Sequence, residues 1–477
     1  MKICLLCEGC YPYVVGGVSS WVQQLIKNFP QYEFSIYAIA ADSSQKGDFK
    51  FELPENCTSV QEIFLNDAFI ADTFEKKSET SVKPWEINEF KKLFLADLDK
   101  WDSIFEFFNR GKHIVISFLT SREFYDIVYE VYMKQYSLTI FTDFLWTMRS
   151  MYLTLFHIFN NPPERADLFH CVSTGYGGIA GSLAKRIYGS GLVITEHGIY
   201  TREREEEIIK AEWVSEDFKP LWINYFKSLS KGAYNSADRI IALFDTNSKI
   251  QNENGADKLK CAVIPNGINV SLFQNLPGKT AEDSGFINVG AVIRVSPIKD
   301  IKTMLYAFDA VKNRLPNARF YIMGPTDEAP EYYEECLSIL KEMGTADIVF
   351  MGRVNVRDQI GRMDVMVLTS ISEAQPLALM EAMAAGIPCV STNVGCCNEL
   401  FNGSKDDHLG VCGLTAPIMN YEKIADCIVH IVSDPVLAKR YGETGKQRII
   451  TYYSEDKFRL AYRKLYESFD TPKNSNV

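Results

Sequence analysis

Short apolar runs of strand length alternate with amphipathic helical segments along this chain, and that alternation restricts its fold more than any other feature. Residues 3–7 and 34–40 are such runs, and over 18–29, between them, apolar residues recur at helical spacing. Strand, helix and strand in succession are typical of parallel sheets with crossover helices. The sequence therefore predicts an α/β fold with doubly wound, Rossmann-like sheets. The predicted strands are 3–7, 34–40, 168–173, 192–196, 240–244 and 262–264, followed by 286–289, 319–323, 348–351, 365–369 and 388–391.

The alternation pauses once, at a Gly, Pro and polar segment over 275–285 that reads as a linker. We therefore predict an N-terminal domain over 1–275, with a mostly helical insertion at about 45–110, and a C-terminal domain over 286–451. The tail over 452–477 is expected to be a helix that packs back on the N-terminal domain. Because doubly wound sheets bind ligands at the carboxyl ends of their strands, the two domains are expected to face one another across a cleft.

Composition excludes some classes of partner. The 477 residues carry a formal net charge of −11, which argues against nucleic acid and acidic membranes, since both need a basic surface. The first residues lack the longer apolar core and the small-residue cleavage site typical of a signal peptide. The most apolar stretch, 141–159, is interrupted by Asp143, Arg149 and His157. We expect a cytoplasmic protein that reaches a membrane only through a partner.

Two spacings resemble metal sites, and neither is predicted to hold a metal. Cys4, Cys7 and Cys10 form a C-x-x-C-x-x-C run, but a buried first strand would point alternate side chains in opposite directions. The only D-x-D, Asp97 to Asp99, is expected on a helix surface. Twelve cysteines without a small-domain framework fit reduced thiols.

The segment S-E-A-Q-P-L-A-L-M-E carries the strongest candidate site. It follows a predicted strand and opens a helix near Pro376, a residue favoured in a first turn. Glu373 can accept hydrogen bonds from sugar hydroxyls, and free backbone N–H groups from Gln375 to Leu377 suit a phosphate. Glu381, one turn inside the helix, could bind ribose hydroxyls. On spacing alone, two surface glutamates on an ordinary helix remain an equal alternative.

Glu373 and Glu381 match the E-x7-E motif of the retaining glycosyltransferases of family four, which have the two-domain GT-B fold, and the chain resembles that family. Further signatures of the family occur in the same order. Over nearly its whole length the chain resembles, more closely, the glycosyltransferases of the Pel exopolysaccharide system, beginning with C-E-G-x-Y-P-Y-V-x-G-G-V-S-S-W. Besides E-x7-E, the signatures of family four in this chain are Gly16-Gly17-Val18, Glu196-His197-Gly198, Pro265-Asn266-Gly267-Ile268-Asn269, and Arg294 with Lys299.

The resemblance implies roles for these residues. Gly16 and Gly17 would let the backbone approach a ligand at the start of a helix. Arg294 and Lys299 would neutralise the diphosphate as it leaves, Arg as a fork and Lys as a point charge. His197 would lie near the reacting face of the donor sugar.

Further positions are less specific. Gly324 and Val354 would line the nucleotide pocket, each just after a predicted strand. His170 also ends a strand, and a structural or a functional role is equally open. The charged segment over 202–208 could serve the acceptor or form a solvated face.

The chain departs from the family pattern in its loops. Ile293 replaces the usual Gly before the phosphate Arg, Asp300 replaces the Gly after the phosphate Lys, and Asn269 replaces Asp after P-N-G-I. These changes could alter loop geometry, but none of them removes the phosphate cations.

The resemblance implies retaining transfer from a UDP-sugar to a growing bacterial exopolysaccharide, without cofactor or metal. UDP-glucose is the first choice of donor and a UDP-N-acetylhexosamine the second, and export would need a separate membrane-bound partner. A catalytically silent sugar-nucleotide-binding scaffold and a UDP-sugar epimerase are the alternatives. A nicotinamide dehydrogenase is remote, because the first strand–helix turn lacks G-x-G-x-x-G.

Overall fold

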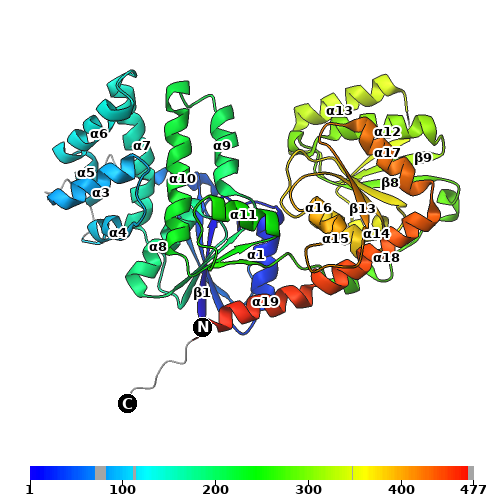
Figure 1. Cartoon of the computed structure of the whole chain (residues 1–477), viewed down its shortest axis with the longest axis horizontal. Coiled ribbons are helices and arrows are strands. Elements are labelled where there is room, and N and C mark those ends of the chain that lie inside the picture. The colour runs from blue at the N-terminus through cyan, green and yellow to red at the C-terminus, as the bar shows by residue number, and fades with distance from the viewer. Residues whose placement is uncertain (70–81, 111–113, 346, 471–477) are drawn as a thin grey trace, which may run out of the picture. The chain divides into compact units, whose positions relative to one another are not determined.

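A computed structural model describes residues 1–69, 82–110, 114–345 and 347–470, and the chain divides into two compact units. Figure 1 shows each unit as a sheet covered by helices. The α/β class and the two Rossmann-like domains predicted from the sequence are confirmed. The N-terminal unit consists of Met1–Ala242, Asn247–Val263 and the described residues from Tyr466 onward, and the C-terminal unit of Leu243–Thr246 and Ile264–Leu465.

The sheet of the N-terminal unit has seven parallel strands in the order β3-β2-β1-β4-β5-β6-β7. The order reverses between β1 and β4, and their fully buried apolar side chains place both in the middle of the unit. The strands are β1 (Lys2–Glu8), β2 (Glu33–Ala40), β3 (Cys57–Phe64), β4 (Leu168–Cys171), β5 (Gly191–Glu196), β6 (Arg239–Ala242) and β7 (Cys261–Val263).

The prediction for residues 45–110, of which 70–81 lie outside the described residues, is wrong in two respects. Cys57–Phe64 is not helical but forms edge strand β3, which pairs in parallel with β2. Asp97 and Asp99 lie in the loop after α3 rather than on a helix, and Asp99 forms an ion pair with Lys231.

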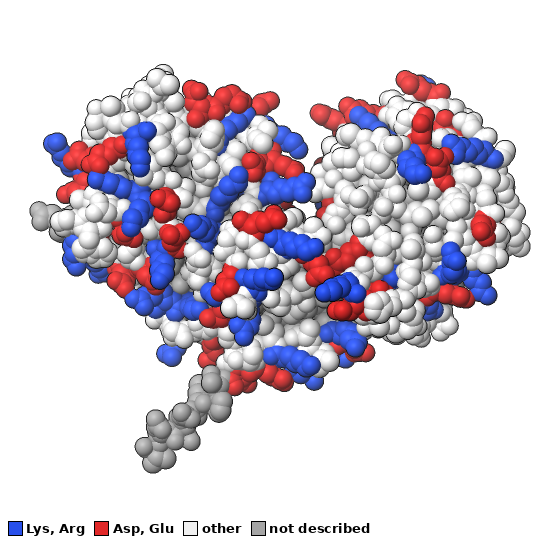
Figure 2. Space-filling view, in the orientation of Figure 1, with Lys and Arg blue, Asp and Glu red and all other residues white. Residues whose placement is uncertain are grey.

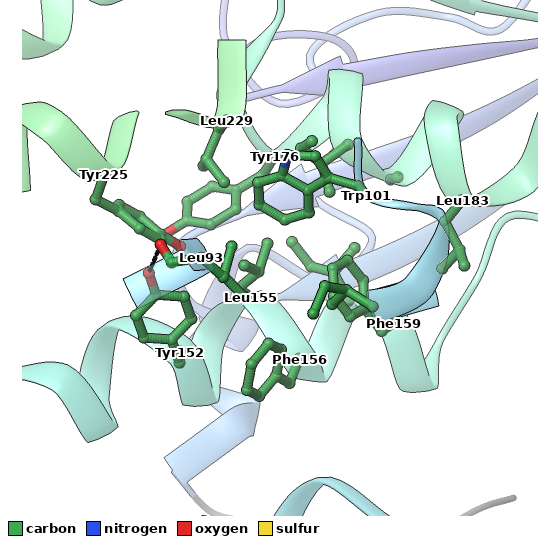
Figure 3. Close-up of a cluster of buried hydrophobic side chains, with 14 of the residues drawn as sticks. Leu93, Trp101, Tyr152, Leu155, Phe156, Phe159, Tyr176, Leu183, Tyr225 and Leu229 are labelled. Atoms are coloured by element: carbon green, nitrogen blue, oxygen red, sulfur yellow. Dashed lines mark hydrogen bonds between the residues drawn. The ribbon is translucent and has the colours of Figure 1, made fainter. Parts of the chain in front are cut away.

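In the described residues between β3 and β4, helices α3 to α7 form a helical layer beside α8 and α10. Its aromatic core explains the many Phe residues of this stretch, since each buries a large apolar area. Figure 3 shows Trp101, Tyr152, Leu155, Phe156 and Phe159 of this layer packed near Tyr176 and Leu183 of α8 and Tyr225 and Leu229 of α10. The helices are α1 (Gly17–Asn28), α3 (Pro84–Phe94), α4 (Asp102–Phe108), α5 (Ile114–Leu119), α6 (Arg122–Gln135), α7 (Phe141–Asn160), α8 (Gly175–Tyr188), α9 (Tyr200–Lys210), α10 (Lys219–Ser236) and α11 (Asp245–Glu253).

The sheet of the C-terminal unit repeats this pattern with six parallel strands in the order β10-β9-β8-β11-β12-β13. Here the order reverses between β8 and β11, which are hydrogen-bonded neighbours. Its strands are β8 (Ile287–Val292), β9 (Ala318–Met323), β10 (Ile348–Gly352), β11 (Val365–Leu368), β12 (Cys389–Thr392) and β13 (Gly413–Ala416). Its helices are α12 (Ile301–Arg314), α13 (Pro330–Met343), α14 (Val356–Ile360), α15 (Leu377–Ala384), α16 (Cys397–Asn402), α17 (Tyr421–Val432), α18 (Pro435–Tyr452) and α19 (Glu455–Glu467).

The units divide earlier in the chain than the expected linker at 275–285. Ile264 already belongs to the C-terminal unit, and Ile268 forms a bridge with Ser454. Within the expected linker, Lys279 forms an ion pair with Asp364 of the same unit. The tail is shared: residues up to Leu465 belong to the C-terminal unit and those from Tyr466 to the N-terminal unit.

The surface carries both signs of charge. Figure 2 shows Lys and Arg interspersed with Asp and Glu on the face that it presents. In the described part of the chain, no helix combines the length and apolarity needed to cross a bilayer. Within the same residues, no group of three or more His, Cys, Asp or Glu side chains is arranged to hold a metal ion.

Candidate functional site

The loops that follow β8 and β11 carry the main candidate residues of the C-terminal unit. Arg294 and Lys299 follow β8, and Glu373 follows β11. The strand order reverses between these two strands, and doubly wound sheets bind ligands at the carboxyl ends of strands at such a point. The fold thus brings together two loops, after β8 and after β11, that lie about seventy residues apart in the sequence.

Lys299 and Glu373 form an ion pair there. The Nζ of Lys299 lies 2.5 Å from Oε1 of Glu373, and the two side chains are 16% and 14% exposed. The hydroxyl of Ser370 donates a second hydrogen bond to the same carboxylate oxygen, at 2.6 Å. The sequence did not identify Ser370, because its role depends on this non-local geometry.

The end of β11 fixes the loop that carries Lys299. The hydroxyl of Thr369 donates to the carbonyl oxygens of Lys299 and Asp300, at 3.0 and 3.1 Å. The backbone N–H of Ile371 donates to the carbonyl of Ile298 at 2.9 Å. These three bonds join one loop to the other and hold the backbone of Lys299 in position.

Two departures from the family pattern have local explanations. Asp300 has φ +48°, in the left-handed region that favours Gly, and its Oδ1 accepts a hydrogen bond from the N–H of Thr303 as the cap of α12. Gly324 approaches the backbone of Ile293 so closely that a Cβ there would lie 1.9 Å from the Ile293 carbonyl oxygen. The backbone of Ile293 does not adopt a positive φ, so this position accepts a side chain. Gly324 provides the room for the close approach of the Ile293 carbonyl.

Arg294 is paired with a carboxylate that the sequence analysis missed. Its Nη1 lies 2.6 Å from Oε2 of Glu328, in the loop between β9 and α13, and both side chains are nearly half exposed. The neighbouring Asp327 accepts two hydrogen bonds from Arg353, just before Val354, at 3.1 and 3.2 Å. The loops after β8, β9 and β10 are therefore connected by exposed ion pairs.

Helix α15 begins at Leu377, as the sequence predicts, with Pro376 as its N-cap and no side-chain cap. Gln375 is only 7% exposed, and its side-chain oxygen accepts the N–H of Asn266 at 2.7 Å, so its side chain fixes the P-N-G segment. Gly395, another residue that the sequence did not identify, has φ +53°, and a Cβ there would lie 2.3 Å from the carbonyl oxygens of Glu373 and Ala374.

Glu381 lies inside α15. Its carboxylate has no hydrogen bond to any residue that the structure describes. Burial raises the pKa of Glu381 to about 7, and the positive charge of Arg357 opposes this shift only in part. A carboxyl group whose pKa lies near neutrality can accept or donate a hydrogen bond to a ligand hydroxyl.

In the N-terminal unit, Gly16 and Gly17 follow β1 at the reversal of strand order. Gly16 is extended, with φ −174°, and is the N-cap of α1, which has no side-chain cap. A Cβ on either glycine would meet no atom within 4 Å. Open space therefore adjoins the uncapped start of a helix, whose N–H groups favour an anion.

The two candidate histidines have different surroundings. The ring of His197, after β5, lies edge to face with Trp21 at 4.6 Å, and its buried Nε2 has no hydrogen-bond partner within the described residues. Both ring nitrogens of His170 are bound at 2.8 Å, to Tyr466 and to Thr195, which favours a structural role. Burial lowers the pKa of both histidines to about 3, with the neighbouring His197 adding to the effect at His170.

The charged segment after His197 forms helix α9. Its arginines form ion pairs along the helix, Arg202 with Glu206 at 3.5 Å and Arg204 with Glu207 at 2.8 Å. The side chain of Glu203 folds over Gly198, where a Cβ would collide with its carboxylate. The charged side of α9 is therefore partly exposed to solvent. Because Gly198 has no side chain, it leaves room for Glu203 in the turn next to His197.

Comparisons with known proteins agree with this description. Residues 1–259 match the family model described as a domain of unknown function (DUF3492), and residues 284–434 match the one described as glycosyl transferases group 1. The chain is 25% identical over 294 residues to the UDP-Gal:alpha-D-GlcNAc-diphosphoundecaprenol alpha-1,3-galactosyltransferase of Escherichia coli, covering 57% of this chain and 68% of that protein.

Solved structures resemble the whole chain at low identity. Sucrose-phosphate synthase of Thermosynechococcus elongatus has a TM-score of 0.60 and 16% identity, covering 98% of both chains. Anabaena Alr3699/HepE in complex with UDP-glucose has a TM-score of 0.58 and 15% identity, covering 98% of this chain and 100% of that one. At such identities the likeness establishes the fold. The chain therefore belongs to the DUF3492 family and, with a group 1 glycosyltransferase domain in its second unit, to the glycosyltransferases of GT-B fold.

Proposed function

We propose that this glycosyltransferase transfers a sugar from a UDP-sugar to a growing bacterial exopolysaccharide with retention of configuration at the anomeric carbon. The observation that carries the proposal is the pairing of Lys299 with Glu373 at the reversal point of the second sheet. There a cation suited to a diphosphate lies beside a carboxylate suited to sugar hydroxyls.

The donor class is supported by known proteins of the same fold. The E. coli relative is named for a UDP-linked sugar, and the Anabaena structure contains UDP-glucose. UDP-glucose is our first choice of donor and a UDP-N-acetylhexosamine the second. The two sugars differ by a hydroxyl against an acetamido group, and the shape of the donor pocket decides between these groups.

The reaction requires stabilisation of the leaving diphosphate. The oxygen of an acceptor hydroxyl bonds to the anomeric carbon of the donor sugar while the bond from that carbon to the phosphate oxygen breaks. The released phosphate oxygen takes the proton of the hydroxyl. Arg294, Lys299 and the N-terminus of α15 would neutralise the developing charge, which is the largest contribution to such catalysis. With two cations available, the proposal requires no metal ion.

The N-terminal unit would bind the acceptor. His197 would act as a neutral imidazole, because its low pKa keeps it uncharged near neutral pH. Sequence similarity to the Pel enzymes favours an exopolysaccharide of that type, exported by a separate membrane-bound partner.

The test is binding and hydrolysis of a panel of UDP-sugars, by calorimetry and UDP release, with and without a chelator. Tight binding of one UDP-sugar that is lost in Glu381→Ala and Lys299→Ala supports the donor site. NMR of the product then reads the anomeric configuration, and conversion of one UDP-sugar into another would reveal an epimerase. No binding of any nucleotide sugar contradicts the proposal and favours a silent scaffold.

A further inference from the structure

Three aromatic side chains, His170, Trp21 and His197, pack against one another in the N-terminal unit. The indole of Trp21, in α1, lies edge to face with both imidazoles, with centroid distances of 5.8 Å to His170 and 4.6 Å to His197. His170 lies in β4 and His197 follows β5, the neighbouring parallel strand. All three residues are buried. Because a close-packed interior leaves little free space, a shift of one ring displaces the others.

His170 is held at both ring nitrogens. Its Nδ1 lies 2.8 Å from the hydroxyl of Tyr466, and its Nε2 lies 2.8 Å from the hydroxyl of Thr195. Burial lowers the pKa of His170 to about 3, so the ring is neutral near pH 7 and carries a single N–H. One nitrogen therefore donates and the other accepts. Bonds on opposite sides of the ring fix its rotation.

Strand β5 fixes the backbone next to His197 but not its imidazole. Thr195 lies in β5 two residues before His197, and side chains two residues apart in an extended chain project to the same face. The bond from Thr195 to His170 thus places both histidines on one face of the sheet. There the imidazole of His197 is oriented by its packing against Trp21.

Tyr466 joins this arrangement from the far end of the sequence. From Tyr466 onward the chain belongs to the N-terminal unit, and the residue is fully buried. Its ring lies against Phe29 and Tyr32, with centroids at 5.6 and 5.8 Å. Phe29 is the C-cap of α1, the helix that also carries Trp21. Tyr466 thus contacts the end of α1 through its ring and His170 through its hydroxyl.

We propose that Tyr466 and His170 are positioning residues for the transfer reaction, which fix Trp21 and, through it, the imidazole of His197. The role of His197 beside the sugar rests on the proposed function, whereas the positioning rests on contacts within the N-terminal unit. A group that must lie close to a reacting centre is sensitive to small displacements, and a shift of about 1 Å can cost about 10²-fold in rate.

Tyr466→Phe tests the proposal, because it keeps the ring contacts and removes the oxygen that binds His170. Tyr37→Phe is the matched control. Tyr37 is fully buried in β2 of the same sheet, and its hydroxyl donates to the carbonyl of Asn161 at 2.7 Å. Each variant therefore loses one buried tyrosine hydroxyl bond, and thermal unfolding should show similar losses of stability.

The two variants should differ in catalysis. UDP release at saturating UDP-sugar should show a kcat about tenfold lower in Tyr466→Phe and unchanged in Tyr37→Phe. Calorimetry should show that both variants bind UDP as the original chain does, because the proposed donor residues belong to the other unit. A loss confined to kcat separates misplacement of His197 from a general loss of folded protein.

Nitrogen-15 NMR of the imidazole rings follows His197 without any turnover. The chain has six histidines, and His197→Gln assigns the signals of His197 by their absence. These signals should shift in Tyr466→Phe and stay in place in Tyr37→Phe.

Equal kcat values for the two variants, or unmoved His197 signals in Tyr466→Phe, overturn the proposal. If the His197 signals shift but the original chain turns over no UDP-sugar, the positioning of His197 is supported and the proposed function is contradicted.

Discussion

The ammonium group of Lys299 is bound to the carboxylate of Glu373 at 2.5 Å, in a pair that is mostly shielded from solvent. A residue expected to neutralise a diphosphate is thus held by a residue expected to contact the sugar. If these two residues bind the donor as proposed, the pair would orient both side chains beforehand, and preorganised groups stabilise a developing charge effectively.

Lys299→Met should therefore lower kcat/KM for the UDP-sugar by about 10²–10³-fold, the usual cost of one transition-state charge contact. Lys302→Met is the matched control, because it removes a lysine three residues away whose partner, Glu335, is exposed. UDP release measured at subsaturating donor checks the effect. Equal rates for the two variants would exclude Lys299 from the donor site.

If Arg294 binds the donor diphosphate as proposed, Glu328 competes with that diphosphate for it. Donor binding would have to break this exposed ion pair, which costs about 0.2–1 kcal/mol. Glu328→Gln should then tighten UDP-sugar binding by about two- to fivefold. Calorimetry compares it with Asp327→Asn, which releases Arg353 instead. Unchanged or weaker binding in Glu328→Gln would mean that Arg294 does not bind the donor.

Asp300 combines an unfavourable backbone conformation with a helix cap. At φ +48°, Asp300→Gly removes strain but loses the bond to Thr303, and we expect stability within about 0.5 kcal/mol of the original. Asp300→Ala keeps the strain and loses the cap, so it should cost about 1–2 kcal/mol. Urea unfolding gives the free energy of unfolding of both variants. An alanine variant at least as stable as the glycine variant would contradict this explanation of Asp300.

The sequence predicts the strands that are strongly apolar and misses those that are not. The segment C-T-S-V-Q-E-I-F of β3 is half polar because an edge strand faces solvent. Strand β13, with the sequence G-L-T-A, contains one large apolar residue. The apolar runs of β1 and β5 are buried throughout their middles, so they are recognisable without tertiary context.

The candidate site shows the same division. Motif spacing identifies Lys299 and Glu373 as candidates, but their contact, like that of Ser370 and Thr369, arises only when β8 and β11 become neighbours. The bond from Asn266 to the side chain of Gln375 likewise joins residues 109 positions apart. Such partners depend on strand order, which local sequence does not encode.

Glu381 should make the C-terminal unit less stable as the pH rises. Its pKa is raised from 4.5 to about 7 in the folded protein, so the folded state keeps a proton that the unfolded state loses. The stabilisation of the protonated form is complete below about pH 4.5 and is lost as the pH rises through 7. A full shift of this size corresponds to about 3 kcal/mol, and residual exposure of the side chain reduces the expected loss to ~1–2 kcal/mol.

Glu381→Gln stays neutral at every pH, so it should lack this loss and be more stable than the original chain at pH 8. Glu422→Gln, at an exposed position on α17, is the control and should retain the original pH dependence. Thermal unfolding from pH 4.5 to 8 measures the difference. If the original chain and Glu381→Gln lose stability in parallel over this range, the carboxyl group does not titrate near neutrality.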